Sequence, residues 1–219
     1  MDRSVRRTLV ILLLVVALIF GFVIVQQMKP LDQPEAAPDL SSLNTFVYDN
    51  PRELTDFSLT NEEGQTTTRQ HLEGQWTFVF VGYTQCPDIC PATMATLRQT
   101  EQRLPPDLPE PSYLLVSADP ERDTPERLKA YLEFFGKDFH GVTGDIDTLR
   151  SLARSVGAVF VHRDDGDGNT LVDHSGHLAL INPQGRMAAV IQPPHDPEKL
   201  AEAYREIYQW TRRNQDVSG

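Results

Sequence analysis

The sequence contains very little cysteine: Cys86 and Cys90 are the only two in 219 residues. Any chemistry that needs two thiols must therefore use this pair. A disulfide that merely staples the fold is a poor explanation, because a bridge across so short a loop removes little entropy from the unfolded chain. A chain of this length can also bury a sizeable core without one. The pair therefore indicates a functional site.

Basic residues are also few, with 20 Lys and Arg against 31 Asp and Glu. The imbalance lies in residues 30–219, which carry 16 basic and 30 acidic side chains, a balance of −14. Such a surface repels nucleic acid, so no nucleic-acid partner is expected. Most of these charges serve solubility, although an acidic face could steer a basic protein or a cation toward the chain.

Charged residues are absent from Leu9 to Val25, which follow three arginines among the first seven residues. A helix over Thr8–Val25 spans about 27 Å, close to the thickness of a bilayer core. No small-x-small cleavage site follows it, which favours an uncleaved anchor over a secretory signal. The arginines predict a single-pass protein of the inner (cytoplasmic) membrane, with a cytoplasmic N-terminus and its domain on the periplasmic side.

The composition changes after this predicted anchor, which we assign to residues 1–28. Residues 29–44 contain three prolines and few large apolar groups, so they are predicted to form an extended tether. Residues 45–213 have the length and hydrophobic pattern of one domain, followed by a short tail at 214–219.

Strands and helices alternate in the predicted domain. Strands are expected at Asp56–Leu59, Trp76–Val81, Tyr113–Ser117, Leu178–Ile181 and Met187–Ile191, and helices at Pro91–Leu104, from Pro125, at Ile146–Val156 and at Pro197–Arg212. Thr124 is predicted to cap the second of these helices, with Pro125 at its first position. The order of elements is strand–helix–strand, then an antiparallel hairpin and a helix. This order predicts a thioredoxin-like α/β sandwich, preceded in the chain by a single transmembrane helix.

The two cysteines lie between the predicted strand Trp76–Val81 and the helix that follows it, after a turn at Gly82–Gln85. A helix N-terminus stabilises negative charge, so the pKa of both cysteines is expected to be lowered. Two such thiolates can bind a soft metal ion together or close into a disulfide.

Three segments in order resemble the Sco/SenC family of copper chaperones for cytochrome c oxidase assembly. They are GYTQCPDICP at 82–91, SADPERDTPE at 117–126 and VDHS at 172–175. The resemblance covers roughly residues 45–210. It implies one copper per chain, Cu(I) or Cu(II), and the copper-bearing subunit of cytochrome c oxidase, at its CuA site, as the acceptor. It also implies a thiol reductant or another copper carrier as a partner.

Two sulfurs need a third ligand, and a histidine nitrogen would complete a trigonal copper site. The resemblance places the copper-binding histidine on His174. This residue precedes the strand Leu178–Ile181, at a point that lies against the cysteine turn in the thioredoxin fold and usually carries a proline, which this chain lacks. His177 is the reserve candidate, and Asp173 could orient the His174 ring. The remaining histidines, His71, His140, His162 and His195, have no comparable support.

An acidic loop at Asp119–Asp123 follows the strand Tyr113–Ser117. Since active groups collect at the carboxyl ends of parallel strands, this loop should share an edge with the cysteine turn. It is interpreted either as a helix-capping turn with solvated charges or as a docking site for a partner. Asp88, Asp119 and Asp173 are candidates for supporting the ligands or docking the partner.

A further acidic segment, Asp165–Asn169, imitates the start of a calcium loop. Thr170 stands where the sharp-turn glycine belongs, and Gly176 where the bidentate glutamate belongs. The segment is therefore predicted to be a surface turn.

Two functions compete for the same thiols. The first is a membrane-anchored copper metallochaperone, which is not an enzyme in the usual sense. The second is a thiol–disulfide oxidoreductase, in which one cysteine attacks a partner disulfide and the other resolves the product. Two features favour the copper metallochaperone over the oxidoreductase. The cysteines are spaced as CxxxC, not CxxC, and a histidine stands where the thioredoxin fold usually has a proline. A peroxidase would need an arginine beside a peroxidatic cysteine, and no such motif is present.

Overall fold

The computed structural model describes residues 3–27, 35–164 and 170–217. The chain divides into two compact units. One comprises the N-terminal segment up to Glu35 together with the end of the chain from Arg212, and the other is Ala36–Thr211. The predicted surface turn at 165–169 lies outside the described residues, as do residues 28–34, which comprise the end of the predicted anchor and the first part of the predicted tether.

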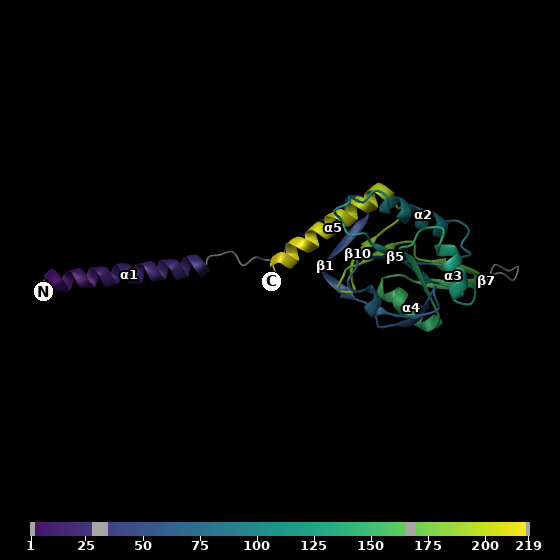
Figure 1. The fold of residues 1–219 in the computed structure, drawn as a ribbon, viewed down its shortest axis with the longest axis horizontal. Coiled ribbons are helices and arrows are strands. Elements are labelled where there is room, and N and C mark those ends of the chain that lie inside the picture. The colour runs from purple at the N-terminus through teal and green to yellow at the C-terminus, as the bar shows by residue number, and fades with distance from the viewer. Residues whose placement is uncertain (1–2, 28–34, 165–169, 218–219) are drawn as a thin grey trace. The chain divides into compact units, whose positions relative to one another are not determined.

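Helix α1 runs from Arg3 to Gln27 (Figure 1). Its stretch Val5–Val23 has a mean hydropathy of 2.3, and none of it is buried. By length and composition it could cross a membrane, and no other helix in the described ranges meets that test. The predicted N-terminal apolar helix is therefore present.

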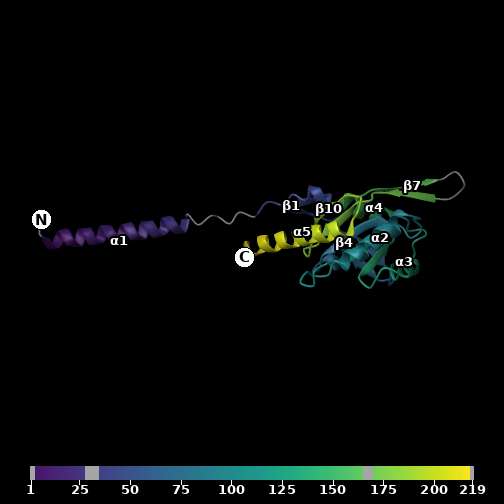
Figure 2. The ribbon, with the colours of Figure 1, turned by 90° about the horizontal axis from the view of Figure 1, so that it is seen from above.

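The second unit contains a mixed sheet covered by helices (Figures 1 and 2). Its strands are β1 Thr45–Glu53, β2 Ser58–Asn61, β3 Thr66–Thr68, β4 Thr77–Gly82, β5 Ser112–Ser117, β6 Phe139–Thr143, β7 Phe160–Asp164, β8 Thr170–His174, β9 Leu178–Ile181 and β10 Arg186–Ile191. The helices are α2 Ile89–Glu101, α3 Pro125–Leu132, α4 Ile146–Ser155 and α5 Pro197–Val217, with short 3-10 turns at Ser41–Leu43 and Arg69–Leu72.

The described strands of the main sheet follow the order β1-β10-β9-β4-β5-β6-β2-β3. Strands β4, β5 and β6 run parallel, whereas β9 pairs antiparallel with both β4 and β10. A parallel core flanked by an antiparallel hairpin confirms the predicted thioredoxin-like sandwich. Strands β7 and β8 form a separate hairpin that projects from one end of the unit (Figure 2).

Every residue of β4 and β5 is buried, which explains their nearly continuous apolar sequence. Aromatic rings stack along one face of these strands. Phe78 lies 5.8 Å from Tyr113 between ring centroids, and Tyr113 lies 4.4 Å from Phe139. Tyr204 of α5 closes this layer against Phe78 at 5.9 Å. The packing fixes the register of the strands whose carboxyl ends carry the functional loops.

Three chain segments meet at one end of the sheet. β4 and β5 both end there, because they are parallel and Gly82 pairs with Ser117. β9 begins there, because it is antiparallel to β4 and Leu178 pairs with Phe80. The cysteine turn, the acidic loop and the segment before β9 are thus brought together by topology.

The predicted boundaries hold for β9 and differ by a residue or two for most other elements. Helix α2 begins at Ile89, two residues earlier than predicted, and therefore includes Cys90 in its first turn. Helix α5 continues past the predicted end at Arg212 to Val217. Thr124 caps α3, as predicted, by accepting a hydrogen bond from the backbone N–H of Arg127 at 3.3 Å.

Sequence reasoning missed β1, β3, β6 and the hairpin β7–β8. Strand β1 was missed because Asp49, Asn50 and Pro51 are typical of turns. The strand lies at an edge of the sheet and its pairing shifts register between Val47 and Arg52, which is where a proline is tolerated in a strand. Strand β6 was missed because it is short and contains Gly141.

Helix α3 packs so closely on β6 that only a glycine fits at position 141. A Cβ atom there would lie 2.9 Å from Cδ1 of Leu132 and 3.4 Å from Cδ2 of Leu128, both of which are buried. We expect Gly141→Ala to lower the free energy of unfolding by about 1–3 kcal/mol, because a packed core must shift to accept the methyl group. Urea unfolding of the full-length chain in detergent measures this. Gly176→Ala is the control, since its Cβ would meet only Pro193, at 3.8 Å. Equal stability of the two variants would contradict the close packing of α3.

Candidate metal centre

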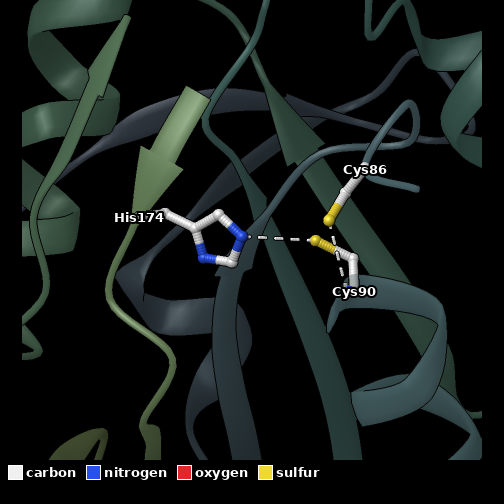
Figure 3. A group of neighbouring side chains, drawn as sticks. All are labelled: Cys86, Cys90 and His174. Atoms are coloured by element: carbon white, nitrogen blue, oxygen red, sulfur yellow. Dashed lines mark hydrogen bonds between the residues drawn. The ribbon is translucent and has the colours of Figure 1, made fainter. Parts of the chain in front are cut away.

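The two cysteines differ in environment. Cys86 lies in the turn between β4 and α2 and is partly exposed, whereas Cys90, in the first turn of α2, is buried (Figure 3). Both are free thiols. The backbone N–H of Cys90 points at the sulfur of Cys86, at 3.4 Å. One sulfur therefore faces solvent and the other faces the protein interior.

Cys90 is buried because its sulfur packs over Gly82 at the end of β4. A Cβ atom at position 82 would lie 2.9 Å from the Cys90 sulfur and 2.6 Å from Cε1 of Phe80. Any side chain at position 82 would push the sulfur away. The glycine that ends the strand thus makes room for a thiol against the sheet.

His174, the last residue of β8, completes the group. Its Nε2 lies 3.4 Å from the Cys90 sulfur, and both sulfurs and a ring nitrogen lie within 4.8 Å of one another. Figure 3 shows the ring pointing at the two sulfurs from the opposite side of the site. Within the ranges that the structure describes, this is the one group of three or more His, Cys, Asp or Glu side chains close enough to share a metal ion.

The orientation of the His174 ring is set by its other nitrogen. Nδ1 lies 3.1 Å from the backbone carbonyl oxygen of Ser175. A carbonyl can only accept, so Nδ1 carries the proton and Nε2 presents its lone pair to the sulfurs. The rings of Phe80 and Tyr83 meet the imidazole edge to face, at centroid distances of 5.6 and 6.0 Å. The imidazole is held ready to act as a ligand.

The expectation that Asp173 orients this ring is wrong. The Asp173 side chain is exposed and forms an ion pair with Arg163, on the outer face of the hairpin. Neighbouring residues of a strand point to opposite faces, so Asp173 and His174 cannot both face the sulfurs. The carbonyl of Ser175 takes the predicted role.

Burial controls the protonation of the site. It raises the pKa of the Cys90 thiol well above its usual value and lowers the pKa of His174. The expected lowering of both cysteine pKa values by the helix N-terminus is therefore wrong for Cys90, where desolvation is the larger effect. Without a metal, Cys90 and His174 are both neutral at pH 7, and a metal ion that binds here must displace the Cys90 proton.

The geometry suits a soft metal ion. Ligand bonds of about 2.0–2.3 Å place three donors roughly 3.5–4 Å apart around a trigonal ion, and the three donor atoms already lie within 4.8 Å of one another. Two thiolates and one imidazole are the donors that copper prefers among such ligands.

The other predicted residues lie outside this group. Asp88 is exposed at the N-cap of α2 and makes no side-chain capping bond. Asp119 is buried and paired with Arg122, so its carboxylate is not available to dock a partner. His177, the reserve ligand, places its Nε2 3.0 Å from the carbonyl oxygen of Val156 instead.

The acidic loop does share an edge with the cysteine turn, as expected. Its contact residue is Asp123, which accepts hydrogen bonds from Thr84. Sequence reasoning named the loop but missed this residue. The signal that could have identified it was a set of polar residues, Thr84, Ser117 and Asp123, directly after two strands that are otherwise apolar.

Comparison with known proteins identifies the family to which this chain belongs. The model of the SCO1/SenC family matches residues 48–209. A protein of Stutzerimonas stutzeri, provisionally named as copper-binding, is 36% identical over 166 residues, which cover 74% of this chain and 81% of that protein.

Solved structures of other proteins have a fold similar to that of this chain. The crystal structure of Arabidopsis thaliana ScoI with copper bound is 30% identical, has a TM-score of 0.67 and is matched over 71% of this chain and 98% of that chain. Bradyrhizobium japonicum ScoI with copper bound is 28% identical, with a TM-score of 0.63 and coverage of 72% and 99%. With three quarters of its length matched by the family model and its thiols and imidazole gathered at one end of the sheet, the chain belongs to the SCO1/SenC family.

Proposed function

We propose that this chain is a copper metallochaperone that holds one copper ion with Cys86, Cys90 and His174. The observation that carries the proposal is the orientation of His174: its Nε2 lies 3.4 Å from the Cys90 sulfur while its Nδ1 faces the carbonyl of Ser175, and both cysteines are free thiols. This position usually carries a proline in the thioredoxin fold, so an imidazole here favours a metal ligand over disulfide exchange alone. The copper-bound relatives support copper as the metal.

The donor set suits a carrier of copper in either oxidation state. Two thiolates satisfy Cu(I) with few ligands, and the imidazole adds the third donor that Cu(II) favours. Because Cys86 is partly exposed while Cys90 is buried, an acceptor can reach the metal from the Cys86 side. Transfer then proceeds by ligand exchange: a donor of the acceptor replaces Cys86 first, and the buried ligands release the ion last.

The acceptor we propose is the copper-bearing subunit of cytochrome c oxidase, at its CuA site, in accord with the family's role in oxidase assembly. Another copper carrier would load the site. A thiol reductant would keep Cys86 and Cys90 reduced, because a disulfide offers no thiolate to a metal.

A second function, thiol–disulfide exchange with cysteines of the oxidase or another exported protein, is favoured by the unequal exposure of the pair. A partly exposed Cys86 can attack a partner disulfide, and the buried Cys90 next to it can resolve the mixed disulfide. The same thiols would then prepare the acceptor and metallate it.

Helix α1 supplies the location. We place its apolar part as a single span of the inner membrane, with the arginines at the start of the helix in the cytoplasm and the copper-binding unit on the periplasmic side. A tethered carrier on that side can meet an exported, membrane-bound subunit.

The first prediction concerns copper stoichiometry. The full-length chain, purified in detergent and reduced without oxygen, should bind one copper per chain, because both thiolates and the imidazole are available. The same chain with Cys86 and Cys90 joined as a disulfide should bind copper at least 100-fold more weakly. Metal analysis after equilibrium dialysis measures both, and equal affinity of the two redox forms would refute the thiolate site.

A second prediction separates the chaperone from the oxidoreductase. His174→Ala removes the nitrogen ligand and keeps both thiols. Mutation of a residue that hydrogen-bonds to a metal ligand typically lowers metal affinity by ~10–100-fold, so loss of the ligand itself should lower Cu(II) affinity by more. Thiol–disulfide exchange should persist. His177→Ala is the matched control, because its ring faces the carbonyl of Val156 and should leave copper affinity unchanged.

The decisive comparison is oxidase maturation in cells that carry either His174→Ala or the double variant Cys86→Ser, Cys90→Ser. If both fail alike, copper carriage is the function. If His174→Ala supports normal oxidase assembly without added copper while the double variant does not, thiol exchange is the function.

A third prediction concerns topology. A reporter fused after Gly219 should be active on the periplasmic side only, because three arginines precede the apolar segment. An alkaline phosphatase fusion, which folds only outside the cytoplasm, is paired with a cytoplasm-dependent fluorescent protein. Fluorescence without phosphatase activity would reverse the orientation.

A further inference from the structure

A fully buried carboxylate lies beneath the cysteine turn and has no part in the function proposed so far. Asp123 is 0% exposed. Its Oδ1 accepts hydrogen bonds from the Thr84 hydroxyl at 2.6 Å and from the Thr84 backbone N–H at 3.2 Å. Its Oδ2 accepts one from the Ser117 hydroxyl at 2.6 Å. Both oxygens are thus satisfied.

These bonds join two loops that are far apart in the sequence. Ser117 ends β5, while Thr84 lies two residues after β4 and two residues before Cys86. Asp123 itself is held by its backbone N–H, which donates to the carbonyl of Asp119 at 2.9 Å. The Ser117 hydroxyl in turn accepts from the backbone N–H of Asp119, at 3.0 Å. The carboxylate therefore connects the turn that carries Cys86 to a rigid strand end.

A second contact from the same loop reaches the residue before Thr84. Arg122, oriented by its ion pair with the buried Asp119, lies over the Tyr83 ring, with its guanidinium carbon 6.0 Å from the ring centroid. The Tyr83 ring also packs against His174. The loop 119–123 thus holds the two consecutive residues that lead into the Cys86 turn.

The turn needs such support because its own backbone supplies little. Between the end of β4 and the start of α2, Cys86 donates to the carbonyl of Tyr83 at 3.2 Å, and Cys90 donates only to the Cys86 sulfur. A buried carboxylate is costly, and burial raises the pKa of Asp123. A costly group that contacts the turn directly before a ligand is better explained by positioning than by general stability.

We propose that Asp123, acting through Thr84, is a positioning residue that holds the Cys86 turn at the spacing that binds copper and resists closure to a disulfide. The inference deepens the proposed function and rests on it for the copper part. The ligand atoms lie within 4.8 Å of one another, whereas a disulfide requires a sulfur–sulfur distance of about 2.05 Å. Closure to a disulfide must bring the two free sulfurs to that distance, and the bonds from Thr84 to Asp123 resist any movement of the turn that this requires.

The sharpest test changes Thr84, because its substitutions alter the contact while leaving the buried carboxylate in place. Thr84→Val keeps the shape and removes the hydroxyl, whereas Thr84→Ser keeps the hydroxyl. Asp123→Asn is the third variant. The chain offers a matched control: Asp145 accepts from the backbone N–H and the hydroxyl of Thr148, at 2.9 and 2.7 Å, at the start of α4. Thr148→Val and Asp145→Asn alter the same kind of threonine–aspartate hydrogen bond, at a place where it does not contact the cysteine turn.

Two quantities are measured on each full-length variant in detergent. One is copper affinity, together with the thiolate-to-Cu(II) charge-transfer absorption. The other is the equilibrium of the metal-free chain with glutathione, in which the chain disulfide and two glutathione thiols exchange with the chain dithiol and one glutathione disulfide.

We expect Thr84→Val and Asp123→Asn to weaken copper binding by about 10–100-fold and to shift the charge-transfer band. They should also move the glutathione equilibrium toward the chain disulfide by about 2–10-fold, the effect of one lost hydrogen bond. Thr84→Ser should resemble the unmodified chain in both measurements. The Thr148 and Asp145 variants should change thermal stability only, because a contact that stabilises both redox forms equally cannot move their equilibrium.

The proposal is overturned if Thr84→Val matches Thr84→Ser in the glutathione equilibrium, or if the Thr148 and Asp145 variants shift it equally. Failure of the proposed function is a separate outcome, seen when the unmodified chain binds no copper. The glutathione comparison still decides the role of Asp123 in that case.

Discussion

The contact between the Cys90 sulfur and the His174 ring is the constraint on which the site depends. It joins residues 84 positions apart across the end of a buried strand, and each member is shifted toward its neutral form by burial. A neutral thiol beside a neutral imidazole is stable without metal, whereas two buried charges would not be. In the proposed function, this neutral pair would keep the ligands in place before copper binds.

Because Cys90 and His174 are neutral without a metal, binding and release of copper are coupled to a proton. Copper must displace the Cys90 proton to bind, so a proton must return when copper leaves. In the function we propose, the partly exposed Cys86 exchanges with an acceptor before the buried ligands release the ion. The difference in exposure between the two sulfurs would then give the transfer a direction, from the interior outward.

Small residues and polar groups around this contact position the ligands. Gly82 leaves space for the Cys90 sulfur, and the carbonyl of Ser175 orients the imidazole. The carboxylate of Asp123 connects the Cys86 turn, through Thr84, to Ser117 at the end of β5. Each of these groups lies near the carboxyl end of a core strand or before β9, at the end of the sheet where the topology brings these segments together.

The sequence by itself determined the apolar N-terminal helix, the core strands β4 and β5, the cap of α3 and the candidate ligands, because these depend on local patterns: hydrophobic runs, capping residues and short motifs. It named His174 through a motif, but could not show that Asp173 faces away, because the hairpin β7–β8 was not predicted and alternation along β8 decides that question. The raised pKa of Cys90 was also beyond local reasoning, since desolvation comes from Gly82 and the strands behind it. Only the tertiary structure brought Thr84, Ser117 and Asp123 together, because their contact depends on the parallel pairing of β4 with β5 and on no pattern within either segment.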